Sequence, residues 1–346
     1  AMDLKTNYGD LDGTGLAELV RRGEVTPLEL VDEAIRRTEA VDGSLNAVIT
    51  RMFEHARDAA KAPLPDGPFA GVPFLMKDFL AEIAGVPFYE GSDFLEGYIP
   101  AEDSEIYRRF TRAGLITIGK TNLPEMAIGA TTEPRRFGPT RNPWDLTRTP
   151  GGSSGGAAAA VAARVVPMAH GNDVGGSIRI PASCCGLVGL KPTRGRVTLA
   201  PHYGDLFAGY LAENSLTRTV RDTAGLLDAI AGPMPGEPYP APPPERPFAQ
   251  EVGADPGRLR IGFSTVTPLG DPLDPECRTA VERAAALCEA LGHEVVEAAP
   301  SCDAEAFWTA YTGVLADGIA WALADWSRRL GRPCHTHLPP TPLIHV

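Results

Sequence analysis

The chain has 346 residues, of which 43% are hydrophobic and 22% are charged. This length and composition predict a soluble globular protein with a sizeable core. The formal net charge of −12 argues against a nucleic-acid partner, because phosphate binding needs a basic face. No apolar run is long enough to span a membrane, and the N-terminus lacks the pattern of a signal peptide. We therefore expect a cytoplasmic protein with no membrane partner.

The N-terminal segment, residues 14–61, has apolar residues at helical spacing. The spacing predicts two helices within 14–37, and Thr26 followed by Pro27 marks the start of the second one. A further helix is expected over residues 45–61. We expect these helices to support the fold and to carry no chemistry.

Lys77 stands at the end of a short apolar run. Phe74, Leu75 and Met76 predict a buried strand that ends in Lys77 and Asp78. Such a lysine either extends from the strand end into water or is a desolvated, neutral base. The run alone leaves both interpretations open.

Residues 105–126 predict a helix, then a strand, then a loop. Within them, Gly114–Thr121 matches the phosphate-binding expression G-x-x-x-x-G-K-[ST]. We reject this match because the four intervening residues, LITI, themselves favour a strand, and Pro124 disfavours the helix that should follow. This segment therefore predicts no phosphate-binding loop.

Two glycine-flanked serine sites follow, Ser153–Ser154 and Ser177, on either side of an alanine-rich helix predicted over 157–163. Small neighbouring residues let a substrate carbonyl approach a serine. A free backbone at such a site can also aim N–H groups at a developing oxyanion. The two serine sites are therefore the candidate catalytic centre.

The sequence GGSSG around Ser153 also fits the nucleophile elbow G-x-S-x-G. That motif needs a strand leading into the serine and a partner histidine late in the chain, but the preceding NPWDLTRTP is too turn-rich for a central strand. His335 and His337, near the end, have no further metal ligands beside them. We therefore expect neither a nucleophile elbow nor a metal or other cofactor.

Strands and helices alternate after the serine sites. A strand is expected near 165–169 and a turn over 173–177. Residues 232–256 are proline-dense and predict a surface excursion. Residues 258–346 predict a β-α-β unit followed by a helix over 304–329. A parallel strand pair of this kind fits an α/β sheet.

The longest motif is GGSSGGAAAAVAARVVPMAHGNDVGGSIRIPASCCGLVGLKPTRGRV, and it resembles the signature of the amidase signature family of serine hydrolases. The resemblance extends back through GVPFLMKD, GKTNLPEMA and TTEP, covering residues 14–228 well and the rest loosely. AHGND, RIPAS and TRTVRD are similar to bacterial amidases of the 6-aminohexanoate-cyclic-dimer hydrolase type. The glutaminase subunit of tRNA-dependent amidotransferases usually carries an LDQ-G element, which is replaced here, but that function stays an alternative.

The resemblance implies an α/β fold of the amidase signature type, with a central mixed β-sheet sandwiched between helices. It implies one domain over 1–346: N-terminal helices at 14–61, the signature core at 65–230, the excursion at 232–256, and a possibly truncated part at 258–346. Family members usually continue past this length. An active amidase and a catalytically impaired relative are therefore both open. We expect an open site with an exposed strand edge or a covering partner, such as a second copy of the chain.

The resemblance also implies the chemistry, which is hydrolysis of carbon–nitrogen bonds in a small linear or cyclic carboxamide without a cofactor. Ser177 would be the nucleophile, Ser153 the bridging serine after a cis peptide bond, and Lys77 the base of a Ser-cisSer-Lys triad. The spacing of 24 residues selects Ser153 rather than Ser154 as the bridge. Two further residues, Ala127 and Ile128, would line the substrate site.

The physical chemistry is consistent with these roles. A serine hydroxyl needs a base, and a lysine of ordinary pKa, about 10.4, is protonated in neutral water. Burial lowers a lysine pKa by up to roughly 3–5 units, and the run FLMK predicts a buried setting. Four N–H groups lie in one predicted turn and could form an oxyanion hole, those of Val174, Gly175, Gly176 and Ser177. Ser154 and Asp173 would support the relay and the turn, and Lys191 is a rival lysine with an expected structural role.

Overall fold

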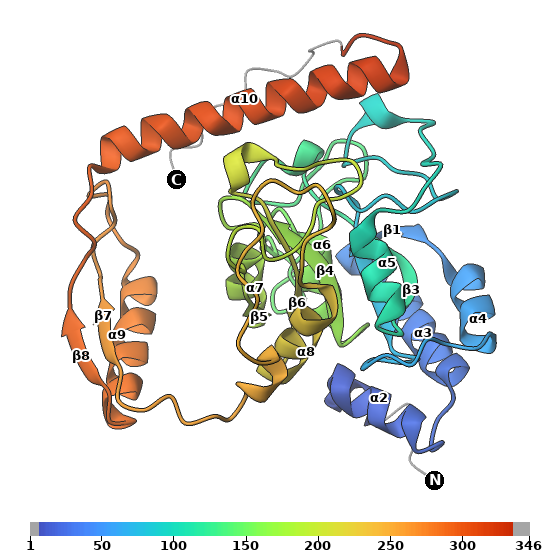
Figure 1. The fold of residues 1–346 in the computed structure, drawn as a ribbon, viewed down its shortest axis with the longest axis horizontal. Helices are drawn as coiled ribbons and strands as arrows, with labels where there is room; N and C mark the ends of the chain where they lie inside the picture. Colours follow the sequence, from blue (N-terminus) through green and yellow to red (C-terminus); the bar gives the residue numbers. More distant parts are fainter. Residues whose placement is uncertain (1–6, 335–346) are drawn as a thin grey trace. The chain divides into compact units, whose positions relative to one another are not determined.

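The computed structural model describes residues 7–334, which divide into two compact units (Figure 1). Among these residues, one unit comprises 7–252 and 321–334, and the other comprises Gly253–Ala320. The first unit contains all of the candidate catalytic residues. The expectation of a single domain over the whole chain stays a prediction.

A six-stranded mixed sheet forms the centre of the first unit, in the order β1-β3-β2-β4-β6-β5. β2 is parallel to both β3 and β4, whereas the β1–β3, β4–β6 and β5–β6 pairs are antiparallel. The mixed central sheet expected from the resemblance is confirmed. Its strands are β1 (Val48–Arg51), β2 (Pro73–Lys77), β3 (Ile116–Thr121), β4 (Met168–Asp173), β5 (Val188–Gly189) and β6 (Ala212–Thr217).

Helices pack against this sheet and bury its apolar side chains. The alanine-rich α6 lies against β4 and is buried along nearly its whole length, because its small side chains allow close approach to the strands (Figure 1). The α-helices are α2 (Gly13–Arg21), α3 (Pro27–Leu45), α4 (Phe53–Lys61), α5 (Glu105–Arg112), α6 (Gly155–Ala162), α7 (Arg179–Cys185) and α8 (Val220–Ile230). Short 3-10 turns occur at η1 (Tyr8–Asp10), η2 (Asp93–Leu95), η3 (Glu125–Ala127), η4 (Phe207–Gly209) and η5 (Phe248–Gln250).

The predicted start of α3 is confirmed. The Thr26 hydroxyl accepts a hydrogen bond from the N–H of Glu29, and the Glu29 carboxylate accepts one from the N–H of Thr26. Pro27 occupies the first turn, where its missing N–H costs nothing. This reciprocal capping box satisfies two backbone donors that the helix itself leaves free.

The helix expected over 45–61 is wrong in its first half, which forms the strand β1. Val48, Ile49 and Thr50 are β-branched, and Val48 pairs with Thr121 of β3. Pairing with the sheet therefore decides the structure of this segment, and helix α4 begins only at Phe53.

The strand expected near 165–169 begins later, at Met168, and runs to Asp173. Val165 and Val166 instead belong to the turn that ends α6, where the N–H of Val165 donates to the Ala160 carbonyl. As a result, β4 ends immediately before the predicted turn over 173–177.

The second unit contains the predicted β-α-β arrangement. β7 (Arg260–Phe263) and β8 (Glu294–Glu297) pair in parallel, and α9 (Pro275–Ala290) connects them. This pair forms a separate two-stranded sheet. α10 (Ala304–Leu330) follows, and only its last part, from Trp321, belongs to the first unit.

The last part of α10 is anchored in the first unit by an aromatic side chain. Trp326 is buried with Phe88 and Leu95, and its indole N–H donates to Glu90 over 3.1 Å. Burial raises the pKa of Glu90 to about 8. Across residues 7–334, no helix is both long enough and apolar enough to cross a membrane.

Candidate active site

Lys77 lies at the end of β2, between β3 and β4, and is completely buried. Its Nζ atom lies 2.7 Å from the Ser153 Oγ atom and 2.6 Å from the Asn172 Oδ1 atom. Two segments far apart in the sequence, the end of β2 and the loop before α6, therefore meet at this amine.

Burial sets the protonation behaviour of Lys77. Desolvation lowers its pKa to about 7, and the negative charges of Glu213, Asp173 and Glu90 oppose that shift. The Nζ atom also lies 5.6 Å from the centroid of the Phe79 ring. A lysine with this pKa is substantially deprotonated near neutral pH and can accept a proton.

Ser153 is buried and follows a cis peptide bond after Gly152. A side chain at Gly152 would clash, because a Cβ atom there would lie 2.9 Å from the Gly129 carbonyl oxygen. The next residue, Ser154, donates its N–H to the Ser177 carbonyl over 3.1 Å. This bond joins the two glycine-flanked serine sites.

Asp173 holds the turn that contains Ser177. Its carboxylate accepts the N–H of Gly176 over 2.8 Å and that of Ile178 over 3.0 Å, and it forms an ion pair with Arg179. Although burial raises the pKa of Asp173, the Arg179 guanidinium and the backbone N–H groups outweigh it and lower that pKa. Asp173 therefore stays a carboxylate that organises the turn.

The expected oxyanion hole needs one revision. The Gly176 N–H already donates to Asp173, so it is engaged inside the turn rather than turned toward a substrate. The candidate donors that remain are the N–H groups of Val174, Gly175 and Ser177. The sequence alone could not show which of the four N–H groups is free to bind a substrate, because that depends on which one donates to the Asp173 side chain.

A cluster of apolar side chains lies beside the turn, formed by Phe79, Leu80, Leu123, Leu206 and Leu211. Ala127 and Val174 pack against this cluster, so the structure brings Ala127 near the 173–177 turn, whereas Ile128 is exposed. Leu80 and Ala127 adopt positive φ angles of 59° and 58°, an uncommon conformation that is concentrated at functional sites.

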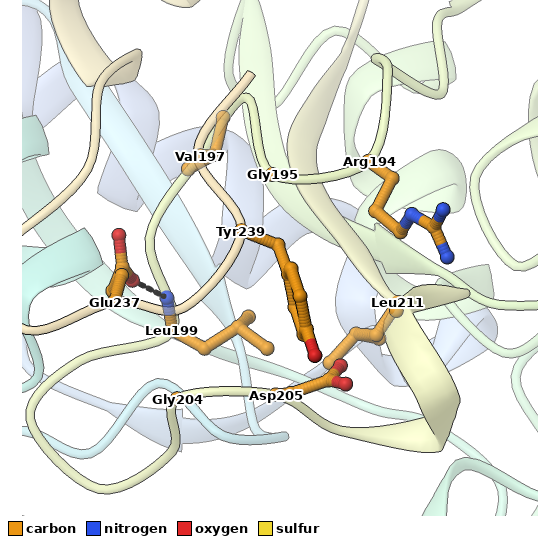
Figure 2. Close-up of a pocket in the computed structure, with 10 residues that line it drawn as sticks. Arg194, Gly195, Val197, Leu199, Gly204, Asp205, Leu211, Glu237 and Tyr239 are labelled. Carbon is orange, nitrogen blue, oxygen red and sulfur yellow. Dashed lines mark hydrogen bonds between the residues drawn. The ribbon is translucent and has the colours of Figure 1, made fainter.

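A pocket extends from this cluster (Figure 2). Leu211 of the cluster and the neighbouring Leu199 form part of its wall, and Arg194 and Asp205 contribute charged groups. Tyr239, from the proline-dense stretch, projects between Leu199 and Leu211 with its hydroxyl end toward Asp205, as Figure 2 shows. The stretch over 232–256 thus contributes to a pocket wall.

Sequence reasoning did not identify Asn172, His170 or Glu213, three buried residues near Lys77. The His170 Nδ1 atom accepts the backbone N–H of Lys77 over 3.2 Å, so its Nε2 atom carries the proton and donates to Glu213 over 2.6 Å. The signal that could have found His170 and Asn172 is the polar run HGND in β4, and the polar run ENS in β6 is the corresponding signal for Glu213; both strands are buried throughout.

The other lysines of the described chain have different surroundings. The Lys191 ammonium donates to the Pro192 carbonyl next to it, in agreement with a structural role. Lys120 lies on β3 and forms a buried ion pair with Asp78, and the strand at this position confirms that Gly114–Thr121 is no phosphate-binding loop. Only Lys77 is placed against a serine hydroxyl among the lysines of residues 7–334.

No group of three or more histidine, cysteine, aspartate or glutamate side chains within residues 7–334 is arranged to hold a metal ion. His335 and His337 lie outside the described residues.

Comparison with known proteins gives consistent matches. The family model described as Amidase matches residues 29–330. A 6-aminohexanoate-cyclic-dimer hydrolase of Paenarthrobacter ureafaciens is 45% identical over 328 residues, which are 93% of this chain and 66% of that protein. The chain thus spans slightly less than two thirds of the length of that relative.

Solved structures agree with the family match. A structure of 6-aminohexanoate cyclic dimer hydrolase has a TM-score of 0.89 and 43% identity, covering 97% of this chain and 69% of that one. A bacterial aryl acylamidase of the amidase signature family has a TM-score of 0.85 and 30% identity, and the match covers 94% of this chain and 69% of that one. The central sheet and its helices are therefore shared with these enzymes.

Proposed function

Because the chain belongs to the amidase signature family, we propose that it hydrolyses carboxamide bonds through an acyl-enzyme on Ser177. The observation that carries the proposal is the contact between the buried Lys77 amine and the Ser153 hydroxyl. A neutral amine in hydrogen-bond contact with a serine is the arrangement that proton abstraction requires.

In the first half of the reaction, Lys77 accepts the proton of Ser153 while Ser153 accepts the proton of Ser177. The Ser177 Oγ atom then forms a bond to the amide carbonyl carbon, and the carbonyl electron pair moves onto oxygen. The N–H groups of Val174, Gly175 and Ser177 stabilise that oxyanion. The C–N bond breaks, and the departing nitrogen takes a proton back through Ser153 from Lys77.

In the second half, water attacks the resulting ester. Lys77 takes the proton of that water, by way of Ser153, as the new C–O bond forms. The bond between the acyl carbon and the Ser177 Oγ atom then breaks, and Ser177 recovers its proton from the relay. The products are a carboxylic acid and an amine, and the enzyme is unchanged.

The substrate we propose is an uncharged amide with an apolar chain, linear or cyclic. The names of its relatives support this class, because one acts on the cyclic dimer of 6-aminohexanoate. The apolar cluster around Phe79 and Leu211 supports it as well. Glutamine, the substrate of the alternative glutaminase function, carries an α-amino group and an α-carboxylate that need charged partners, and because Arg194 and Asp205 in the pocket wall could supply them, that function stays the alternative.

Turnover of the 6-aminohexanoate cyclic dimer, measured as release of primary amine, tests the proposal. We expect Ser177→Ala to lower kcat/KM by about 10⁴-fold or more, because removal of a nucleophile leaves only binding and oxyanion effects. A fluorophosphonate label should be found on Ser177 by peptide mass spectrometry. Ser44→Ala, at an exposed helical serine, is the control.

A label found on Ser153 would contradict the proposal, as would full turnover by Ser177→Ala. Absence of turnover in the parent chain over linear, aryl and cyclic amides would favour the alternative of a catalytically impaired relative. The expected cytoplasmic location, a second copy as partner and the lack of a nucleic-acid partner stay predictions.

A further inference from the structure

Asn172 is the second hydrogen-bond partner of the Lys77 amine. Its Oδ1 atom lies 2.6 Å from Nζ, slightly closer than the Ser153 hydroxyl at 2.7 Å. Asn172 is itself buried and lies in β4, next to the strand that carries Lys77. Both partners of this contact are therefore held by the central sheet.

The orientation of the Asn172 amide is determined by a third group. Its Nδ2 atom donates to the Phe79 carbonyl over 3.3 Å. A flipped amide would place its NH₂ group against the lysine N–H groups and its oxygen against a carbonyl oxygen, losing both hydrogen bonds. The Oδ1 atom therefore faces Lys77.

This geometry directs the lone pair of a neutral lysine. A neutral amine has two N–H donors and one lone pair. When one N–H donates to Asn172 Oδ1, the lone pair can point at the Ser153 hydroxyl, which lies in contact with the same nitrogen. Asn172 thus selects the rotation of the amine that can take a proton.

The absence of charge on Asn172 matters as much as its position. The titratable groups around Lys77 have other partners: Glu213 bonds His170, Asp173 bonds Arg179, Glu90 bonds Trp326, and Asp78 pairs with Lys120. A carboxylate at position 172 would instead touch the amine directly. At that distance an opposite charge strongly favours the ammonium form.

We propose that Asn172 is a positioning residue that aims the Lys77 amine at Ser153 and, being uncharged, leaves that amine free to accept a proton. The inference rests on the proposed function, in which Lys77 is the base. It predicts that the lack of charge at position 172 and the hydrogen bond between Asn172 and Lys77 contribute separately to the reaction rate. Two variants are therefore needed.

The titration of Lys77 can be measured without any substrate. The chain has five lysines, Lys5, Lys61, Lys77, Lys120 and Lys191, so lysine labelled with ¹³C at Cε gives few NMR signals, and Lys77→Met assigns the relevant one. We expect Asn172→Asp to raise the pKa of Lys77 by one unit or more. Asn142→Asp is the matched control, because Asn142 is also buried but its amide contacts Thr149 and Cys184.

Activity supplies the second measurement. Asn172→Asp should lower kcat/KM at pH 7 by roughly fivefold or more, with recovery near pH 9. The reason is that raising the Lys77 pKa by one unit lowers the fraction of uncharged Lys77 at pH 7 about fivefold. Asn172→Leu, which has a similar volume and no acceptor, should lower kcat by roughly tenfold at every pH, without recovery. KM should change less than kcat in both variants.

The inference is overturned if Asn172→Asp leaves the Lys77 titration unchanged relative to Asn142→Asp. It is also overturned if Asn172→Leu keeps the parent rate across the pH range, and this variant decides alone if Asn172→Asp does not fold. An inactive parent chain would count against the proposed function instead, and the NMR titration would still test the effect of Asn172 on Lys77.

Discussion

Lys77 and Lys120 are two fully buried lysines on neighbouring strands, with different partners. Lys120 pairs in register with Met76, so it lies on the face of the sheet opposite Lys77, together with Asp78. There the Lys120 ammonium contacts the Asp78 carboxylate and lies 4.3 Å from the centroid of the Phe88 ring. Among the described residues, the hydrogen bonds of the Lys77 amine go to neutral groups, the Ser153 hydroxyl and the Asn172 amide.

The difference shows that burial alone does not make a lysine a base. A buried ammonium is tolerated when a carboxylate compensates it, and such a pair is structural. In a buried lysine that no carboxylate contacts, desolvation favours the uncharged form, which is the form that accepts protons. The identity of the adjacent side chain therefore separates the two roles.

The largest effect should come from Lys77→Met, which removes the basic amine but keeps the volume and the apolar stem of the side chain at position 77. We expect kcat/KM for the cyclic amide to fall by about 10²–10⁴-fold, the usual contribution of a general base, with the fold retained. Lys191→Met is the matched control and should stay within about twofold, because Lys191 bonds only its neighbour Pro192 among the described residues. Rates within a few-fold of the parent in Lys77→Met would remove the distinction between the two buried lysines.

Lys120→Met should act on stability instead of chemistry. It leaves the Asp78 carboxylate buried without its partner, and breaking a buried pair in this way costs about 3–5 kcal/mol in the free energy of unfolding. Urea unfolding measures the loss. The double variant Lys120→Met, Asp78→Leu should recover most of it, and folded Lys120→Met should keep its rate per molecule within a few-fold.

An outcome in which Lys120→Met is as stable as the parent but inactive would contradict this assignment. It would mean that the Lys120–Asp78 pair, rather than Lys77 alone, takes part in the proton transfer.

The smallest and most graded effect should be that of pH. Since the Lys77 pKa is lowered to about 7, kcat/KM should rise tenfold per pH unit below 7 and level off above it.

The stability of the protein should also depend on the titration of Lys77. Between about pH 7 and 10.5, the unfolded chain binds a proton at Lys77 that the folded chain does not. The parent therefore gains stability relative to Lys77→Met as the pH rises through that range.

Calorimetry of parent and variant over pH 6–10 measures this difference. If the difference in unfolding free energy is independent of pH, the lowered pKa of Lys77 is wrong.

Local signals were enough to predict several elements of the fold. Thr26 and Pro27 marked the start of α3, and the apolar run before Lys77 predicted β2. Residues 48–51 could not be predicted in the same way. Val48, Ile49 and Thr50 are β-branched and favour a strand, but this short signal stands within helical spacing, and the pairing with β3, which is distant in sequence, decides the structure.

The candidate site could be predicted in part. The resemblance pointed to Lys77 and Ser153, and the structure brings these two into contact, although their roles stay proposals. The contributions of Asn172 and Lys120 could not be predicted, because they depend on strand register and on the orientation of one amide. In the sequence, Lys120 stood inside a rejected phosphate-loop expression and inside the stretch GKTNLPEMA of the resemblance, neither of which gave it a role.

The hydrogen bond between Trp326 and Glu90 joins residues 236 positions apart. A ribosome that adds about 5–20 residues per second delivers the tryptophan roughly 10–50 s after the glutamate. During that interval the nascent chain holds Phe88 and Leu95 without the indole that covers them. We therefore expect this aromatic site to be among the last parts of the first unit to close, and to be a point where a chaperone can bind during synthesis.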